Sequence, residues 1–334
     1  MRLRARVLVS CSFSVLLAAC GSDNGDNPFG GLSAGGAGAV TGSGGNTIVV
    51  TTGGSGAATG SGGSVSTGPW MLPAGYSKAN KGGWQLGDPI SGTPTGNGGS
   101  GGAGTMGCGA LIGIVRDFRG ANEPNGHPDF ETFSGEGATP KMVEPALGTD
   151  SKPVYTGVCE TGGKTMACPY GQQTTSKANF DQWYRATDTV NMPYELRLSF
   201  EPDGNGLFTF DSNAFFPLDG TGFGNADNPH NFHFTTEVHT EFIYNGGETF
   251  KFTGDDDLWV FINGKLAIDL GGLHSAVTDQ VDLDKAAGTL GITPGNTYRL
   301  ELFHAERHTD ASNFRVDTTL QFTNCGIFVP DNPK

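Results

Sequence analysis

Three consecutive carboxylates, Asp255, Asp256 and Asp257, stand between two apolar segments of the chain. Carboxylates this close repel one another unless water or a cation screens their charge. Because the flanking segments are typical of buried sheet, little water is expected there. We therefore expect a bound hard cation, and Ca²⁺ in particular, because it accepts several oxygen ligands in loose geometry. The simpler alternative is a solvated acidic turn before a strand.

The elements that must position these carboxylates have the sequence patterns of strands. Apolar or alternating runs occupy residues 109–115, 194–200, 232–242, 250–253, 258–262 and 298–303. Asn263-Gly264 between 258–262 and 266–268 is typical of a type I′ hairpin turn. Only two short helices are expected, at 181–185 and 282–287. Many short strands separated by turn residues predict an all-β fold, a β-sandwich, over residues 108–325.

The N-terminus has the features of an export signal. Three arginines precede an apolar run at 7–17, which is too short for a comfortable transmembrane span. Residues 17–20 read Leu-Ala-Ala-Cys and resemble a bacterial lipobox, which implies that residues 1–19 are removed as a signal peptide and that Cys20 is acylated. By the same resemblance, Gly21 indicates the outer membrane. The alternative is an ordinary signal peptide with an incidental cysteine.

A stretch rich in Gly and Ser, residues 20–107, follows the signal. Such a composition cannot bury enough apolar area to offset chain entropy, so we expect a disordered, flexible tether between the membrane and the domain. Trp70, Trp84 and the apolar residues between them interrupt it. They are either a segment that docks on the domain or mere exceptions. Residues 326–334 are expected to form a C-terminal tail.

Four cysteines remain once the signal is removed and Cys20 carries lipid. They are Cys108, Cys159, Cys168 and Cys325. An even number in an exported chain suggests two disulfides, with three possible connectivities. We favour Cys159–Cys168, which closes a short loop, together with Cys108–Cys325, which joins the two ends of the folded region.

The net charge of −14 narrows the function classes. It argues against nucleic acid as a partner, because nucleic-acid binding needs a basic footprint. It agrees with solubility outside the cell and with cation binding. The chain has no GxSxG or HExxH motif and no phosphate-binding loop. A glycosidase-like carboxylate pair stays open, but we expect a binding protein and not an enzyme.

The region from Val115 onward resembles the fibro-slime domain, a relative of the PA14 domain. The matching pieces are, in order, VRDF at 115–118, HPDFE at 127–131, FDQWYR at 180–185, FFPLDG at 215–220, HNFHFTTE at 230–237, GDDDLWVFINGKLAIDL at 254–270, LGGLH at 270–274 and AERHT at 305–309. The resemblance covers nearly all of 108–325. It implies a PA14-like antiparallel β-sandwich with long loops in a secreted or surface protein.

The resemblance also implies a site. In the PA14-like lectin domains of yeast adhesins, two adjacent aspartates joined by a cis peptide bond hold Ca²⁺, and the ion bridges to sugar hydroxyls. By this resemblance Asp255 and Asp256 are metal ligands, and Asp257 stands where those domains have Gly. Glu306 is the nearest match to a further Asn ligand. Glu in place of Asn would still bind Ca²⁺ but would alter the contact with sugar.

Glu306 and the aspartate pair together would supply three negative charges, a set that suits Ca²⁺. The alternative is that Asp257 caps the hairpin and Glu306 pairs with Arg307 or Arg315. Each alternative predicts different partners for the Glu306 carboxyl.

Two histidines are expected near the same carboxylates. His274 and His308 follow strands of the matching pieces and would lie in loops near Asp255. There they and Asp257 would contact the ligand. Trp259, inside a strand, is expected in the core.

These observations predict a cell-surface lipoprotein of a Gram-negative bacterium with a Ca²⁺-dependent adhesion domain that binds carbohydrate or an extracellular matrix polymer. The first alternative is a structural protein–protein adhesion module in which Ca²⁺ only stabilises loops and the partner is another surface protein. The second is a glycosidase-associated module. We expect the chain to be exported and anchored in the outer membrane through Cys20, facing the cell surface or the periplasm.

Overall fold

A computed structural model describes residues 80–90, 96–97, 108–157, 159–161, 164–166 and 173–328. They belong to the second of two units into which the chain divides, Thr59–Lys334. None of the helices in these ranges is long and apolar enough to cross a membrane.

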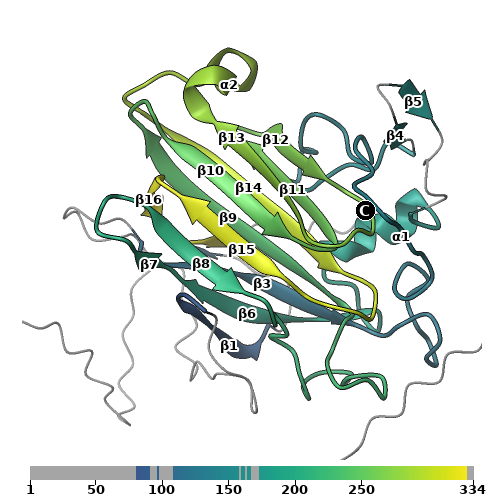
Figure 1. Cartoon of the computed structure of the whole chain (residues 1–334). Coiled ribbons are helices and arrows are strands. Elements are labelled where there is room, and N and C mark those ends of the chain that lie inside the picture. Colours follow the sequence, from purple (N-terminus) through teal and green to yellow (C-terminus); the bar gives the residue numbers. More distant parts are fainter. Residues whose placement is uncertain are drawn as a thin grey trace, which may run out of the picture. The chain divides into compact units, whose positions relative to one another are not determined.

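The larger sheet has eight strands in the order β1-β6-β3-β9-β14-β11-β12, and β16 pairs with β9 beside this path (Figure 1). All of its pairs are antiparallel. The strands are β1 (Gly83–Pro89), β3 (Ala110–Phe118), β6 (Asn191–Ser199), β9 (Phe234–Tyr244), β11 (Asp257–Ile262), β12 (Lys265–Leu270), β14 (Asn296–Glu306) and β16 (Gln321–Asn324).

A second antiparallel sheet has five strands in the order β13-β10-β15-β8-β7. They are β7 (Glu201–Pro202), β8 (Phe208–Ser212), β10 (Thr249–Gly254), β13 (Val277–Asp282) and β15 (Phe314–Thr318). Two small ribbons pair β2 (Gly96–Asn97) with β17 (Ile327–Phe328) and β4 (Cys159–Thr161) with β5 (Lys164–Met166).

The main hydrophobic core draws its side chains from both sheets. Leu302 in β14 and Phe252 in β10 both belong to it. His304 of β14 meets the ring of Phe314 of β15, with 5.1 Å between ring centroids. Strands whose alternate residues point inward from two facing sheets make a sandwich. The predicted all-β sandwich is therefore confirmed.

A second apolar cluster covers the outer face of the larger sheet. The helix α1 (Lys177–Trp183) packs Phe180 against Trp259 of β11, with ring centroids 5.8 Å apart. Trp259 is fully buried, so its predicted core position is confirmed. The helix begins earlier than the expected 181–185, because the Ser176 hydroxyl caps it by accepting a bond from the Asn179 amide at 3.1 Å.

The second helix, α2 (Leu283–Leu290), fits the expectation of a helix from 282 to 287 more closely. Asp282 caps its start, accepting a bond from the Lys285 amide at 3.2 Å. The predicted hairpin is also present between β11 and β12. Asn263 and Gly264 have φ angles of 53° and 69°, the pair of positive values that a type I′ turn requires.

The domain begins earlier than expected. Residues Gly83–Pro89 form β1, an edge strand of the larger sheet, and Trp84 is buried in the main core. The predicted tether, 20–107, is therefore wrong for this stretch: Trp84 and Leu86 alternate inward and supply the apolar burial that the surrounding composition lacks. The docking alternative holds for Trp84, whereas Trp70 lies outside the described residues.

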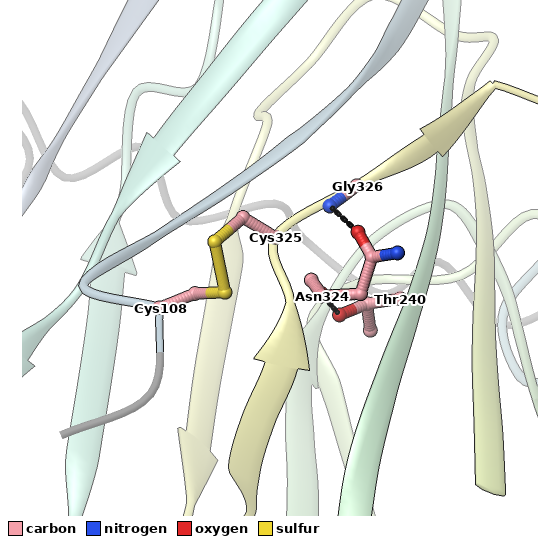
Figure 2. Close-up of a disulfide and its surroundings, with 5 residues drawn as sticks. All are labelled: Cys108, Thr240, Asn324, Cys325 and Gly326. Carbon is pink, nitrogen blue, oxygen red and sulfur yellow. Dashed lines mark hydrogen bonds between the residues drawn. A yellow bond between two sulfur atoms is a disulfide. The ribbon is translucent and has the colours of Figure 1, made fainter. Parts of the chain in front are cut away.

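One of the two expected disulfides joins the ends of the sandwich. Cys108 and Cys325 are bonded across 217 residues of sequence, as predicted (Figure 2). Beside the bridge, the Thr240 hydroxyl donates to the Asn324 carbonyl, and the Gly326 amide donates to the Asn324 side chain at 3.2 Å. The side chain of Cys159 and all of Cys168 lie outside the described residues, so Cys159–Cys168 stays a prediction.

Candidate functional site

The aspartate pair lies where the chain leaves one sheet and enters the other. β10 ends at Gly254 and β11 begins at Asp257, so Asp255 and Asp256 form the link between them. The Asp255–Asp256 peptide bond is cis, as the resemblance implied. β10 pairs with β15 and β11 pairs with β14, so the ends of four strands hold this link.

Both aspartates line a hollow of about 340 Å³. Its other walls come from three loops that are distant in sequence. The lining residues are Ser134, Gly135, Leu273, His274, Ser275, Ala276, His308, Thr309, Asp310, Ala311 and Asn313. The structure thus brings together Asp255, Asp256, His274 and His308, as expected from the sequence.

Asp255 is held from both sides. Its two carboxylate oxygens accept hydrogen bonds from the Asn313 amide at 2.6 Å and the Asn313 side chain at 2.8 Å. Its carbonyl oxygen lies 2.8 Å from Nε2 of the buried His304. Burial lowers the pKa of His304 to about 4, so the ring is neutral near pH 7 and donates through Nε2. The sequence alone did not identify Asn313 or His304 as parts of the site.

Among the described residues, Asp256 accepts one side-chain hydrogen bond, from the Arg307 amide to Oδ2 at 3.0 Å. Glu306, the preceding residue, is fully buried and is not among the residues that line the hollow. Neither of its carboxylate oxygens has a hydrogen-bond partner among the described residues. The nearby Ser312 hydroxyl and His308 amide act to lower its pKa against the larger effect of burial, but neither makes a hydrogen bond of ordinary geometry with it.

Burial and crowding act on these carboxyl groups in the same direction. Burial raises the pKa of Asp255. Burial and the neighbouring carboxylates also raise the pKa of Asp256 and of Glu306 well above the usual range, although Arg307 opposes this for Asp256. The three carboxyl groups are therefore buried, and each is harder to ionise than a free carboxyl group.

Asp257 has a supporting position instead of the ligand contact expected from the sequence. It is fully buried, and its oxygens accept bonds from the Gly272 amide at 2.6 Å and Arg307 Nε at 2.7 Å. Arg307 also donates to the carbonyls of Asp129 and Gln173. Asp257 therefore orients Arg307 and the loop after β12, because it is paired with the Arg307 cation and is not among the residues that line the hollow.

The two histidines differ in burial and in the contacts that their ring nitrogens make. His274 is buried, and its ring nitrogens lie 3.0 Å from the Ser275 carbonyl and 3.1 Å from the Leu270 carbonyl. His308 is half-buried at the edge of the hollow, without a side-chain bond in the described part of the chain. His274 thus helps to form the wall, and His308 is available to a ligand.

The candidate metal ligands fit a hard cation, because the donor atoms of Asp255, Asp256 and Glu306 are all carboxylate oxygens. The Glu306 carboxyl group, which interacts electrostatically with both aspartates and has no hydrogen-bond partner among the described residues, fits as well. Across the described ranges, however, no three His, Cys, Asp or Glu side chains already converge closely enough to hold a metal ion. Coordination by all three carboxylates would need side chains to move.

Residues 201–328 match the PA14 domain family. Among curated proteins, the chain is similar to psiR of Dictyostelium discoideum, at 36% identity over 226 residues that make up 62% of this chain and 21% of that protein. It is also similar to psiC of the same organism, at 37% identity over 225 residues, 63% of this chain and 42% of that protein. The chain thus spans well under half the length of these two relatives.

Among solved structures, the chain is similar to the PA14 sugar-binding domain from an RTX adhesin. The matched region covers 64% of this chain and 94% of the adhesin domain. The sequence identity is 9% and the TM-score 0.27, and we draw no conclusion about function from a likeness of that size. Residues 201–328 are thus similar to the PA14 domain family, while the narrower fibro-slime resemblance stays a prediction.

Proposed function

We propose that this sandwich holds Ca²⁺ at the hollow of Asp255 and Asp256 and uses the ion to bind carbohydrate. The observation that carries the proposal is the Glu306 carboxyl, fully buried with both oxygens unpartnered among the described residues. A buried carboxylate is costly unless it is paired or coordinates a metal. The two arginines expected as possible partners bind other carboxylates: Arg307 pairs with Asp257, and Arg315 pairs with Asp211 and Asp317.

Asp255, Asp256 and Glu306 are the residues that would hold the ion. When bound, Ca²⁺ supplies further coordination positions that sugar hydroxyls can fill. The protein prepares the site through its own bonds. Asn313 fixes the Asp255 carboxylate, and the Arg307 amide fixes that of Asp256. Groups that are already ordered lose less entropy when the ligand binds.

The hollow offers sugar a polar surface next to the ion. His308 is half-buried, and Asp310 and Ser134 are exposed, so these side chains can exchange hydrogen bonds with hydroxyl groups. Binding hollows commonly combine a few polar groups with a fixed wall. The PA14 match supports this assignment through the general binding role of that domain.

A structural adhesion module, in which the ion only stiffens loops, is the second candidate. It is favoured by the bonds that tie the β10–β11 link to residues 307–313, since an ion at this link would tighten the same connection. The partner would then be another surface protein and not a glycan. We regard both candidates as non-enzymatic binding functions, and we do not favour a glycosidase-associated role.

We also propose that the chain is a lipoprotein of the outer membrane, acylated at Cys20. The export signal, the lipobox-like residues and the following Gly support this, and all of them lie outside the described residues. A Cys20→Ala variant expressed in a Gram-negative host should leave the membrane fraction. If it sediments with membranes as the wild type does, the anchor proposal fails.

A glycan array tests the function. The full chain is applied with Ca²⁺ and with EDTA, beside Asp256→Asn and the control Asp188→Asn. Asp188 is an exposed carboxylate without a side-chain bond in the described part of the chain. We expect glycan binding with Ca²⁺ for the wild type and the control, and loss of binding with EDTA or in Asp256→Asn.

Each other outcome decides between the candidates. Glycan binding that persists in EDTA would contradict cation-bridged recognition. If no glycan binds although Ca²⁺ raises the melting temperature of the wild type and not of Asp256→Asn, the structural adhesion module replaces the lectin. Release of sugar from a polysaccharide would overturn the non-enzymatic assignment.

A further inference from the structure

A second and larger hollow, of about 700 Å³, lies between the loops 119–131 and 219–231. Thr309 lines both this hollow and that of the aspartate pair. The two hollows are therefore adjacent, separated by the short segment that follows β14.

The bonds of this dividing segment fix the two hollows relative to each other. Glu131 accepts bonds from the Thr309 amide at 2.6 Å and the Thr309 hydroxyl at 3.2 Å. The Glu131 amide donates to the Arg307 carbonyl at 2.8 Å. The Arg307 amide in turn donates to Asp256. A continuous set of hydrogen bonds thus runs from the second hollow to the proposed cation site.

The lining of the second hollow suits hydroxyl groups. Asn122, Asp227 and Asn228 line it, and their side chains have no hydrogen bond to any of the described residues. Two amides and a carboxylate can together donate and accept several bonds. Glu123 and Glu131 add negative charge, so an anionic ligand would be repelled.

An aromatic wall completes the hollow. Phe223 is half-buried, and the Arg119 guanidinium lies 3.6 Å from the centre of its ring. Sugars present apolar C–H faces as well as hydroxyls, and a hollow with an aromatic wall and a few polar groups can contact both.

The loop behind this wall is held in one shape. Ala226 and Asp227 have φ angles of 50° and 63°, values that non-glycine residues adopt only where their surroundings impose them. Asn225 supplies that constraint, accepting a bond from the Gly220 amide at 2.8 Å and donating to the Pro229 carbonyl at 3.2 Å. The free polar groups of the hollow are therefore positioned in advance.

We propose that the second hollow is a subsite for the neighbouring residues of an uncharged polysaccharide, one sugar of which lies at the aspartate pair. This inference rests on the proposed function and names its ligand class: a neutral polymer instead of a single sugar or an anionic polysaccharide. The adjacency through Thr309, the free polar side chains and the acidic lining carry it together.

Calorimetry with Ca²⁺ present tests the subsite on the full chain. The probes are neutral glucose, galactose and mannose oligosaccharides of one to five residues. In the wild type, we expect the affinity for the best-binding series to rise about tenfold with length, as a few added hydrogen bonds would give. In the double variant Asn122→Ala/Asn228→Ala this gain should vanish while the single sugar binds as before. Gln280→Ala, an exposed amide on β13, is the matched control.

The outcomes separate this inference from the function on which it rests. If single sugars bind but length adds nothing, or if the double variant keeps the whole gain, the subsite is wrong and the cation site stands. Tighter binding of a uronate-containing oligosaccharide than of its neutral counterpart would also overturn the subsite. If no sugar binds the wild type with Ca²⁺, the proposed function and the subsite fail together.

Discussion

Glu237 and Glu306 are both buried on paired strands, β9 and β14, yet their surroundings are opposite. Glu237 accepts bonds from Arg116 at 2.7 Å and from Lys152, and its Oε1 lies 2.5 Å from His239. Burial alone would raise the pKa of Glu237, but Lys152 and Arg116 hold it well below the usual range. Glu306 has no hydrogen-bond partner among the described residues, and burial raises its pKa well above that range.

The difference separates a structural carboxylate from a candidate ligand. Both oxygens of the Glu237 carboxylate are paired within the protein, so Glu237 fixes the loop of Lys152 on the outer face of the larger sheet. Glu306 has no such partner among the described residues, and it lies next to a hollow whose lining includes Asp255 and Asp256. We therefore look for the missing partner outside the chain, in a cation.

Breaking the complete cluster should have the largest effect. Glu237→Gln removes the buried carboxylate that Arg116 and Lys152 both bind, and we expect it to lower the free energy of unfolding by about 3–5 kcal/mol. Denaturant unfolding monitored by fluorescence measures this, with Asp188→Asn as the control. A loss below about 1 kcal/mol would show that the cluster is not the structural centre described above.

A third buried glutamate gives a prediction about pH. Burial raises the pKa of Glu301 to about 7, although Arg299 opposes the shift, from an ordinary value of 4.5. Between these values the folded chain binds more protons at Glu301 than the unfolded chain does, so the contribution of Glu301 to stability is highest below pH 4.5, falls as the pH rises to about 7 and is constant above. The total change is about 3 kcal/mol.

Unfolding measured across pH for the wild type and Glu301→Gln isolates this contribution. The difference between the two proteins should change between pH 4.5 and about 7 and be flat above. A difference that stays the same at every pH would contradict the shift.

The orphaned carboxyl should respond in the opposite way to Glu237. In EDTA, Glu306→Gln replaces a buried carboxyl group, whose pKa burial raises, with an uncharged amide of similar size, so we expect no loss of stability and a gain of up to about 1 kcal/mol. In Ca²⁺ the order reverses, because only the wild type gains from the ion. Melting curves under both conditions check this. If Glu306→Gln destabilises the protein in EDTA as strongly as Glu237→Gln does, Glu306 has an internal partner and the comparison fails.

Local patterns were enough to predict much of the sandwich. The alternation in β14 and the Asn263-Gly264 turn between β11 and β12 depend on neighbouring residues, and both are present. β1 was missed because its alternation is short and surrounded by Gly-rich sequence, and its burial depends on pairing with β6, more than 100 residues later (Gly83 with Ser199).

The site was predictable only in part, for the same reason. Asp255 and Asp256 were recognised from their types and their place before a hairpin. Asn313 was missed because it reaches Asp255 only when β15 pairs with β10. The sequence predicts a ligand contact for Asp257 because nothing local reveals its partner, Arg307, which lies 50 residues away in sequence. The second hollow is made by loops, which have no periodic pattern to reveal it.

Titration of Ca²⁺ into the metal-free full chain by calorimetry tests the central claim most directly. We predict that the wild type and Asp188→Asn bind one ion per chain, whereas Asp256→Asn and Glu306→Gln bind it at least about tenfold more weakly, since each loses a charged ligand. Equal affinity in the wild type and both site variants, or no binding by the wild type, would contradict the account.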